Sequence, residues 1–249
     1  MEEYTMSITE DKKPIYKRVL LKLSGEALGG EKGEGLNEAV MAEFASEIAE
    51  VVNKGVQVAI VIGGGNIFRG IAGTEKGFDR VRGDQMGMLA TVINSIGLSV
   101  FLKDAGVKAE VFTSVPMMPI AKYYMRDDVV SFLNEGGVAI LAGGTGNPFF
   151  TTDSASALRA CEIKADALLK GTKVDGVYDC DPMKNPSAKK YKELTFDKAI
   201  ADNLHVMDQT AFTMCKENDM PIIVFNMNKE GELARIVAGE PVGTVVSNK

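Results

Sequence analysis

The chain has 249 residues, of which 45% are hydrophobic and 25% charged, a balance typical of a globular protein with a large core. Its net charge of −6 excludes the broad basic surface expected of a nucleic-acid-binding protein, so local groups must hold any anionic ligand. The three cysteines, Cys161, Cys180 and Cys215, are odd in number and widely spaced, which indicates reduced thiols in a cytoplasmic protein.

The amino terminus predicts neither a signal peptide nor a membrane anchor. Residues 1–13 are polar, carry acidic residues early and lack an apolar segment. No uninterrupted apolar run approaches the roughly 18 residues that a membrane span needs. We expect residues 1–15 to form a flexible leader and residues 16–249 to form a single domain.

The first half of the chain alternates strand-like and helical segments. Apolar runs predict strands at 16–23, 56–62 and 107–113. Asn37 can cap a helix that continues to about Lys54, and Gly55 can end it. A longer helical segment is predicted from Asp84 to about Leu102.

The second half continues the same alternation. Helices are predicted at 127–135, 154–164, 196–204, 211–217 and 231–238, and strands at 138–141, 165–170, 222–225 and 243–247. This order predicts an α/β fold with a mainly parallel sheet covered by helices on both faces. Ligands bind outside the carboxyl ends of the strands in such sheets.

Three glycine-rich turns follow predicted strands directly, after Leu23, Ile62 and Leu141. Consecutive glycines let the backbone approach a ligand closely and present several N–H groups to an anion. One such turn is ordinary chain reversal, but three in equivalent positions predict a phosphate or nucleotide site. The chain contains neither the G-x-G-x-x-G fingerprint nor a G-x-x-x-x-G-K-[ST] loop, so the phosphate must be bound in another way.

Two cations stand beside these glycines. Lys22 lies near the end of the first strand, where its ammonium can neutralise phosphate oxygens or simply reach solvent. Arg69 follows the second glycine turn and offers a planar fork suited to phosphate.

Several polar residues have two alternative roles at this level. Asp84 can cap the long helix or accept hydrogen bonds from ribose hydroxyls. Asp153 can cap the next helix or hold a catalytic lysine in place. Asp181 can accept a hydrogen bond from a hydroxyl group or serve as a carboxylate beside a metal ion. In the segment 143–154, three polar side chains (Thr145, Asn147 and Thr151) can contact the edge of a base, and Phe149 or Phe150 its face. His205, the only histidine, is not expected to act as a general base.

These segments resemble the bacterial UMP kinases of the amino acid kinase family. The matching motifs are KLSGEAL, VIGGGNIFRG, GDQMGMLAT, GTGNPFFTTDSA, TKVDGVYDCDP, VMDQTAF and PIIVFNMN, which span most of the chain from residue 16 to residue 246. The first two motifs indicate the wider family, and GTGNPFFTTDSA indicates the uridylate branch. The resemblance implies a three-layer αβα sandwich and a homo-oligomer, usually a hexamer built from dimers.

The resemblance also assigns roles to individual residues. The implied ATP contacts are Lys22, Leu23, Ser24, Gly25, Gly65, Arg69, Thr172, Tyr178 and Asp181. The implied UMP contacts are Gly64, Asp84, Thr145, Gly146, Asn147, Pro148, Phe149, Phe150, Thr151 and Thr152. The implied catalytic residues are Lys22, Arg69 and Asp153, and the implied loop for GTP activation is Gly30, Glu31, Lys32, Gly33, Glu34 and Gly35.

The expected reaction is the reversible transfer of the ATP γ-phosphate to UMP, giving UDP and ADP. The expected cofactor is Mg²⁺ carried by ATP without a dedicated protein metal site. GTP is the candidate activator and UTP the candidate inhibitor, while no nucleic acid or membrane is expected as a partner. Two alternatives stay open: another family member acting on a carboxylate or carbamate, and a nucleotide-sensing regulatory protein on the same fold.

Overall fold

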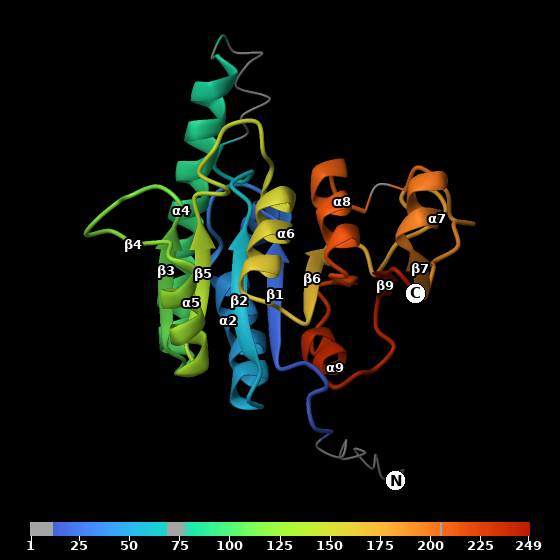
Figure 1. Ribbon diagram of the computed structural model, residues 1–249, viewed down its shortest axis with the longest axis horizontal. Helices are drawn as coiled ribbons and strands as arrows, with labels where there is room; N and C mark the ends of the chain where they lie inside the picture. The colour runs from blue at the N-terminus through green and yellow to red at the C-terminus, as the bar shows by residue number, and fades with distance from the viewer. Residues whose placement is uncertain (1–11, 69–76, 78, 205) are drawn as a thin grey trace.

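The computed structural model describes residues 12–68, 77, 79–204 and 206–249. Within them, nine strands form one sheet in the order β4-β3-β5-β2-β1-β6-β8-β9-β7 (Figure 1). The strands are β1 (Arg18–Leu23), β2 (Gln57–Ile62), β3 (Ala109–Thr113), β4 (Lys122–Tyr123), β5 (Val138–Ala142), β6 (Ala167–Thr172), β7 (Glu193–Thr195), β8 (Ile222–Asn226) and β9 (Thr244–Ser247).

The sheet is parallel from β4 through β8. β9 then runs antiparallel to β8, and β7 pairs parallel to β9 at the far edge. The central strands β1, β2 and β5 are buried over almost their whole length, which is why they appear in the sequence as continuous apolar runs. The mainly parallel sheet predicted from the sequence is therefore confirmed.

Helices cover both faces of the sheet. They are α1 (Gly25–Leu28), the 3₁₀ turn η1 (Gly30–Lys32), α2 (Glu38–Asn53), α4 (Arg80–Asp104), α5 (Arg126–Asn134), α6 (Thr152–Glu162), α7 (Phe196–Ala201), α8 (Gln209–Glu217) and α9 (Glu232–Val237). The core on one face joins α2, α4 and α9, and the core on the other joins α5, α6, α7 and α8. Successive β1 residues such as Leu20 and Leu21 enter opposite cores, as strand geometry requires.

The ends of the helices agree with some of the predicted caps and starts and differ from others. Asn37 caps α2 by accepting a hydrogen bond from the Val40 amide, as predicted. The prediction that α4 begins at Asp84 is wrong, because the helix starts at Arg80 and Asp79 accepts from the first amides. Asp84 therefore lies inside α4 with its carboxylate available for other partners. The short elements α1, η1, β4 and β7 were not predicted, since none contains enough residues to show a period.

α4 contains a window of 18 residues that is long and apolar enough to cross a membrane, the single such helix among the described residues. Half of this window is buried inside the protein, including the polar residues Asn94 and Ser95. Because those polar residues interrupt the window, it does not appear in the sequence as a continuous apolar run. α4 therefore packs one side against the sheet and leaves the other side exposed.

Candidate active site

The first two glycine turns touch each other at the carboxyl ends of β1 and β2. The Gly63 amide donates to the Leu23 carbonyl at 2.9 Å. A Cβ placed on Gly25 would lie 2.4 Å from the Gly63 carbonyl oxygen, so only glycine fits there. Within the described residues, the amides of Gly64 and Gly65 have no hydrogen-bond acceptor. These two N–H groups remain free to bind an anion.

The third turn, after β5, lies on the other side of the second. The Gly143 amide donates to the hydroxyl of Thr91 on α4, and the Ser114 hydroxyl donates to the Gly144 carbonyl. Gly143, Gly144 and Gly146 all have left-handed φ values of +76°, +61° and +81°. Because β2 lies between β1 and β5 in the sheet, the three turns line one edge of the molecule.

Asp153 holds two lysines at this edge. Its Oδ1 lies 2.8 Å from the Lys22 ammonium, and its Oδ2 lies 2.9 Å from the Lys170 ammonium. Lys22 comes from β1, Lys170 from the neighbouring strand β6, and Asp153 from the first turn of α6. The three side chains are only 11–16% exposed. Two cations share one carboxylate, so the cluster carries one net positive charge and favours an additional anion.

Burial and charge act in opposite directions on Asp153. Burial alone would raise the pKa of its carboxyl group, but the ammonium groups of Lys22 and Lys170 hold that pKa below its usual value. The pKa of Lys170 is lowered chiefly by burial, with Asp153 acting in the opposite direction. Lys170 also donates to the Val206 carbonyl at 2.5 Å, which fixes the position of its ammonium group.

Lys170 is the important residue that the sequence analysis missed. Its signal was present: a lysine inside a buried strand directly before a glycine, as Lys22 stands shortly before Gly25. Asp153 was predicted either to cap a helix or to hold a lysine in place, and the structure shows it paired with Lys22. The alternative, capping of α6, is wrong because the Thr151 hydroxyl caps that helix.

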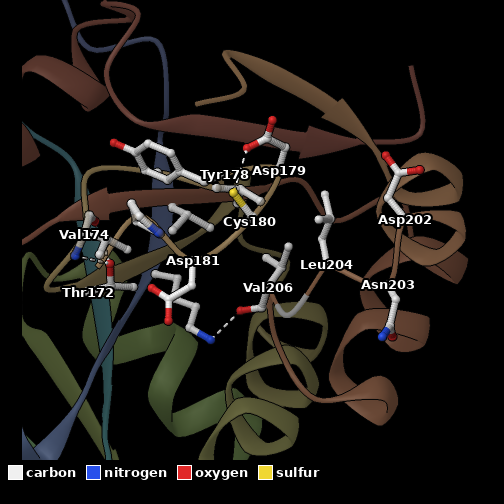
Figure 2. A pocket seen from close by; sticks show the side chains of 15 residues that line it. Thr172, Val174, Tyr178, Asp179, Cys180, Asp181, Asp202, Asn203, Leu204 and Val206 are labelled. Carbon is white, nitrogen blue, oxygen red and sulfur yellow. Dashed lines mark hydrogen bonds between the residues drawn. The ribbon is translucent and has the colours of Figure 1, made fainter. Parts of the chain in front are cut away.

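A cavity of about 450 Å³ opens beside this cluster (Figure 2). The predicted ATP contacts Thr172, Tyr178 and Asp181 all line it, together with Lys170. Figure 2 shows apolar side chains, among them Leu204 and Val206, on the side away from Thr172. The cavity therefore offers apolar walls for a flat ring and polar groups at its edges.

Polar side chains in this cavity are already ordered by local hydrogen bonds. Thr172 donates to the Val174 carbonyl at 2.6 Å, and the Tyr178 hydroxyl donates to Asp175 at 2.5 Å. The hydrogen bond to Asp175 raises the pKa of Tyr178. Asp181 accepts from the Met183 amide at 2.9 Å.

A smaller cavity, of about 190 Å³, lies on the other side of the second glycine turn. The predicted residues Gly64, Asp84, Phe150, Thr151 and Thr152 line it. The other predicted residues of the third loop are not among its lining residues in the described part of the chain; these are Thr145, Gly146, Asn147, Pro148 and Phe149. Thr145 and Asn147 instead hydrogen-bond to each other within the loop.

Asp84 connects this loop to α4. Its carboxylate accepts from Arg80 Nε at 2.8 Å and from the Phe149 amide at 2.8 Å. Phe149 has a left-handed φ of +72°, and Arg80 lies 5.6 Å from its ring centre. A non-glycine residue rarely adopts this conformation, so these contacts hold the loop in a strained geometry.

Comparison with known proteins identifies the family of the chain. The model of the amino acid kinase family matches residues 17–226. The chain belongs to the amino acid kinase family. It is 56% identical to the uridylate kinase of Bacteroides thetaiotaomicron over 233 residues, which covers 94% of this chain and 99% of that protein. It is 55% identical to the uridylate kinase of Parabacteroides distasonis, with the same coverage of both chains.

Solved structures agree with this family assignment. The UMP kinase from Bacillus anthracis superposes with a TM-score of 0.91 at 42% identity, covering 94% of this chain and 97% of its own. The UMP kinase from Ureaplasma parvum gives a TM-score of 0.88 at 35% identity, covering 93% and 98%. The αβα sandwich and the resemblance to UMP kinases that were inferred from sequence motifs are both confirmed.

Arg69 and His205 lie outside the described residues. The loop predicted to bind GTP forms η1 followed by Gly33 in the left-handed region, and the Gly35 amide donates to the Asn66 carbonyl at 3.0 Å. Within the described part of the chain, no three His, Cys, Asp or Glu side chains gather in a metal-binding cluster.

Proposed function

We propose that this chain is a UMP kinase, which transfers the γ-phosphate of ATP reversibly to UMP and forms UDP and ADP. The observation that carries this proposal is the cluster of Lys22, Asp153 and Lys170, with a cavity on either side of the glycine turns next to it. Uridylate kinases at 55–56% identity over 94% of the chain support the same substrate.

The larger cavity is the proposed ATP site. Its apolar walls accept the adenine ring, while Thr172, Tyr178 and Asp181 face the polar edges of the nucleoside. The phosphates then extend over the first turn, where the proposed contacts are Lys22, Leu23, Ser24 and Gly25. Gly65 and Arg69 complete this set. Lys170 stands between the adenine cavity and the phosphates, because it lines the former and binds Asp153.

The smaller cavity is the proposed UMP site. Gly64 binds the acceptor phosphate through its free amide, and Asp84 accepts hydrogen bonds from the ribose hydroxyls. Asp84 already accepts hydrogen bonds from Phe149 and Arg80, so these contacts fix the carboxylate beside the proposed ribose position. The segment from Thr145 to Thr152 then closes around the uridine.

Phosphoryl transfer in this site needs no general base. The second pKa of a phosphate monoester is about 6, so the UMP phosphate is mostly dianionic at pH 7 and is itself the nucleophile. One of its oxygens bonds to the γ-phosphorus as the bond to the β–γ bridging oxygen breaks, and ADP leaves. The main obstacle is repulsion between two polyanions, which the Lys22 and Lys170 ammonium groups and the turn amides offset. Asp153 orients both lysines.

Mg²⁺ is the proposed cofactor and enters with ATP. Mg²⁺ in kinase sites keeps several waters and binds substrate phosphates with only one or two carboxylates. When bound, the ion neutralises charge on the ATP phosphates.

The chain is proposed to form a homo-oligomer, namely a hexamer. One exposed face of α4 supports association between copies. Leu89, Ile93, Ile96 and Val100 are 46%, 48%, 37% and 51% exposed and recur at helical spacing. Such an apolar stripe on a surface helix fits burial against a second copy.

We further propose a cytoplasmic enzyme, activated by GTP at residues 30–35 and inhibited by UTP.

The test is ADP release with ATP·Mg²⁺ and, separately, UMP, dUMP, CMP, AMP, aspartate and acetylglutamate. Rapid turnover with UMP alone supports the proposal. Turnover with a carboxylate substrate, or none with any acceptor, refutes it. Repeating the UMP assay with GTP and with UTP tests the two proposed effectors.

A further inference from the structure

Two buried amide side chains lie behind the second glycine turn. Asn94 on α4 is fully buried, and Asn66 in the turn is 7% exposed. Asn94 Nδ2 donates to Asn66 Oδ1 at 2.7 Å, and Asn66 Nδ2 donates back to Asn94 Oδ1 at 3.0 Å. We refer to Asn66 and Asn94 as the amide pair.

The remaining protons of the amide pair go to backbone carbonyls of two different loops. Asn94 Nδ2 donates to the Gly63 carbonyl at 2.7 Å, and Asn66 Nδ2 donates to the Gly35 carbonyl at 2.6 Å. Both NH₂ groups therefore use both of their protons. Turning either amide around would place an oxygen against a carbonyl oxygen, so the orientation of both side chains is fixed.

This arrangement determines how closely the first two glycine turns approach. A Cβ added to Gly25 would meet the Gly63 carbonyl oxygen at 2.4 Å and Asn66 Oδ1 at 2.5 Å, so the first turn rests on both groups. Asn94 Nδ2 donates hydrogen bonds to the same two groups. The spacing between the turns thus depends on α4, although neither Asn94 nor Asn66 lines the cavities described above.

We infer that Asn66 and Asn94 are positioning residues for phosphoryl transfer. They act through Gly63 and Gly25, and keep the free amides of Gly64 and Gly65 aligned with the Lys22 ammonium. This inference rests on the proposed function, since it assigns the two turns to phosphate binding. A fully satisfied pair of buried amides rigidifies the groups it binds, which here are the two glycine turns.

Asn94→Ala tests this inference, with Ser95→Ala as the matched control. Ser95 is the next residue on α4, is fully buried and donates one hydrogen bond, to the Thr91 carbonyl of its own helix. Both variants lose buried hydrogen bonds, but only Asn94→Ala releases the Gly63 carbonyl. A displacement of about 1 Å at a reacting group can cost about 100-fold in rate. We expect kcat with saturating ATP and UMP to fall by about that factor in Asn94→Ala, while Ser95→Ala stays within threefold of the wild type.

Midpoints of thermal unfolding separate positioning from loss of fold, and all rates are measured well below the lower midpoint. If Asn94→Ala does not fold, Asn94→Ser replaces it with the same expected direction, because the serine side chain is too short to reach the Gly63 carbonyl. A kcat for the Asn94 variant equal to that of Ser95→Ala overturns the inference. Failure of the proposed function is distinguishable, because the wild-type chain would then show no turnover with UMP.

Discussion

Lys22→Met separates the proposed catalytic role of the lysine cluster from its role in stability. Methionine has a similar length but no charge. The Lys22 ammonium lies 2.8 Å from Asp153, whose other oxygen pairs with Lys170 at 2.9 Å. Removing Lys22 therefore leaves one carboxylate paired with one ammonium, and the net charge of the buried cluster falls from +1 to zero.

The expected effects on rate and stability differ sharply. Loss of one preorganised donor aimed at developing transition-state charge costs about 10²–10³ in kcat, or about 3–4 kcal/mol. The free energy of unfolding should change by less than about 1 kcal/mol, because no buried charge loses its partner. UMP affinity should remain largely intact, since the role proposed for Lys22 is on the transferring phosphoryl group and not on the uridine.

Asp153→Asn is the informative contrast. This change leaves two ammonium groups, 11% and 14% exposed, without a carboxylate between them. Breaking a buried ion pair by removing one partner costs about 3–5 kcal/mol. Stability should therefore fall strongly in Asp153→Asn and hardly at all in Lys22→Met, while both variants lose turnover.

The assay combines coupled ADP release for kcat, calorimetry for UMP binding and urea unfolding for stability. Lys54→Met is the control, since Lys54 pairs with Glu50 at 2.7 Å on the surface of α2 and should affect none of the three measurements. An Lys22→Met enzyme with near wild-type kcat would refute the catalytic assignment. A loss of stability equal to that of Asp153→Asn would refute the charge argument.

Three further predictions concern packing, pH and thiol chemistry. Gly25→Ala should abolish turnover and lower the unfolding midpoint, because its methyl group would lie 2.4 Å from the Gly63 carbonyl oxygen; an active, stable variant contradicts this packing. The lowered pKa of Asp153 means that its stabilisation is complete above its unfolded pKa of about 3.9 and is lost as the pH falls through the folded value. The difference in the free energy of unfolding between wild type and Asp153→Asn should therefore become smaller from pH 7 to pH 3. A difference that stays constant over this range argues against a lowered pKa for Asp153. Iodoacetamide at pH 8 should label exposed Cys180 but not Cys215, whose pKa burial raises to about 12, and ATP should protect Cys180; labelling that ATP does not slow counts against the proposed adenine site.

The sequence determined the elements whose signal is local and repeated. Buried parallel strands appear as continuous apolar runs, so the core strands and the glycine turns after β1, β2 and β5 were predictable. The Asn37 cap was predictable because capping depends on residues within a single helical turn. Family motifs then identified Lys22 and Asp153, and the structure brings them into contact.

Only the tertiary structure decided which side chains meet across the sheet. Lys22 and Lys170 meet at Asp153 because β6 lies beside β1, and this pairing places Lys22 next to Lys170 although the two strands are almost 150 residues apart in sequence. The choice of Asp79 over Asp84 as the α4 cap left the latter to bind Arg80 and Phe149. Periodicity and motif reveal what each segment favours by itself. Distances between charged groups follow from packing, where contacts far apart in sequence fix each position.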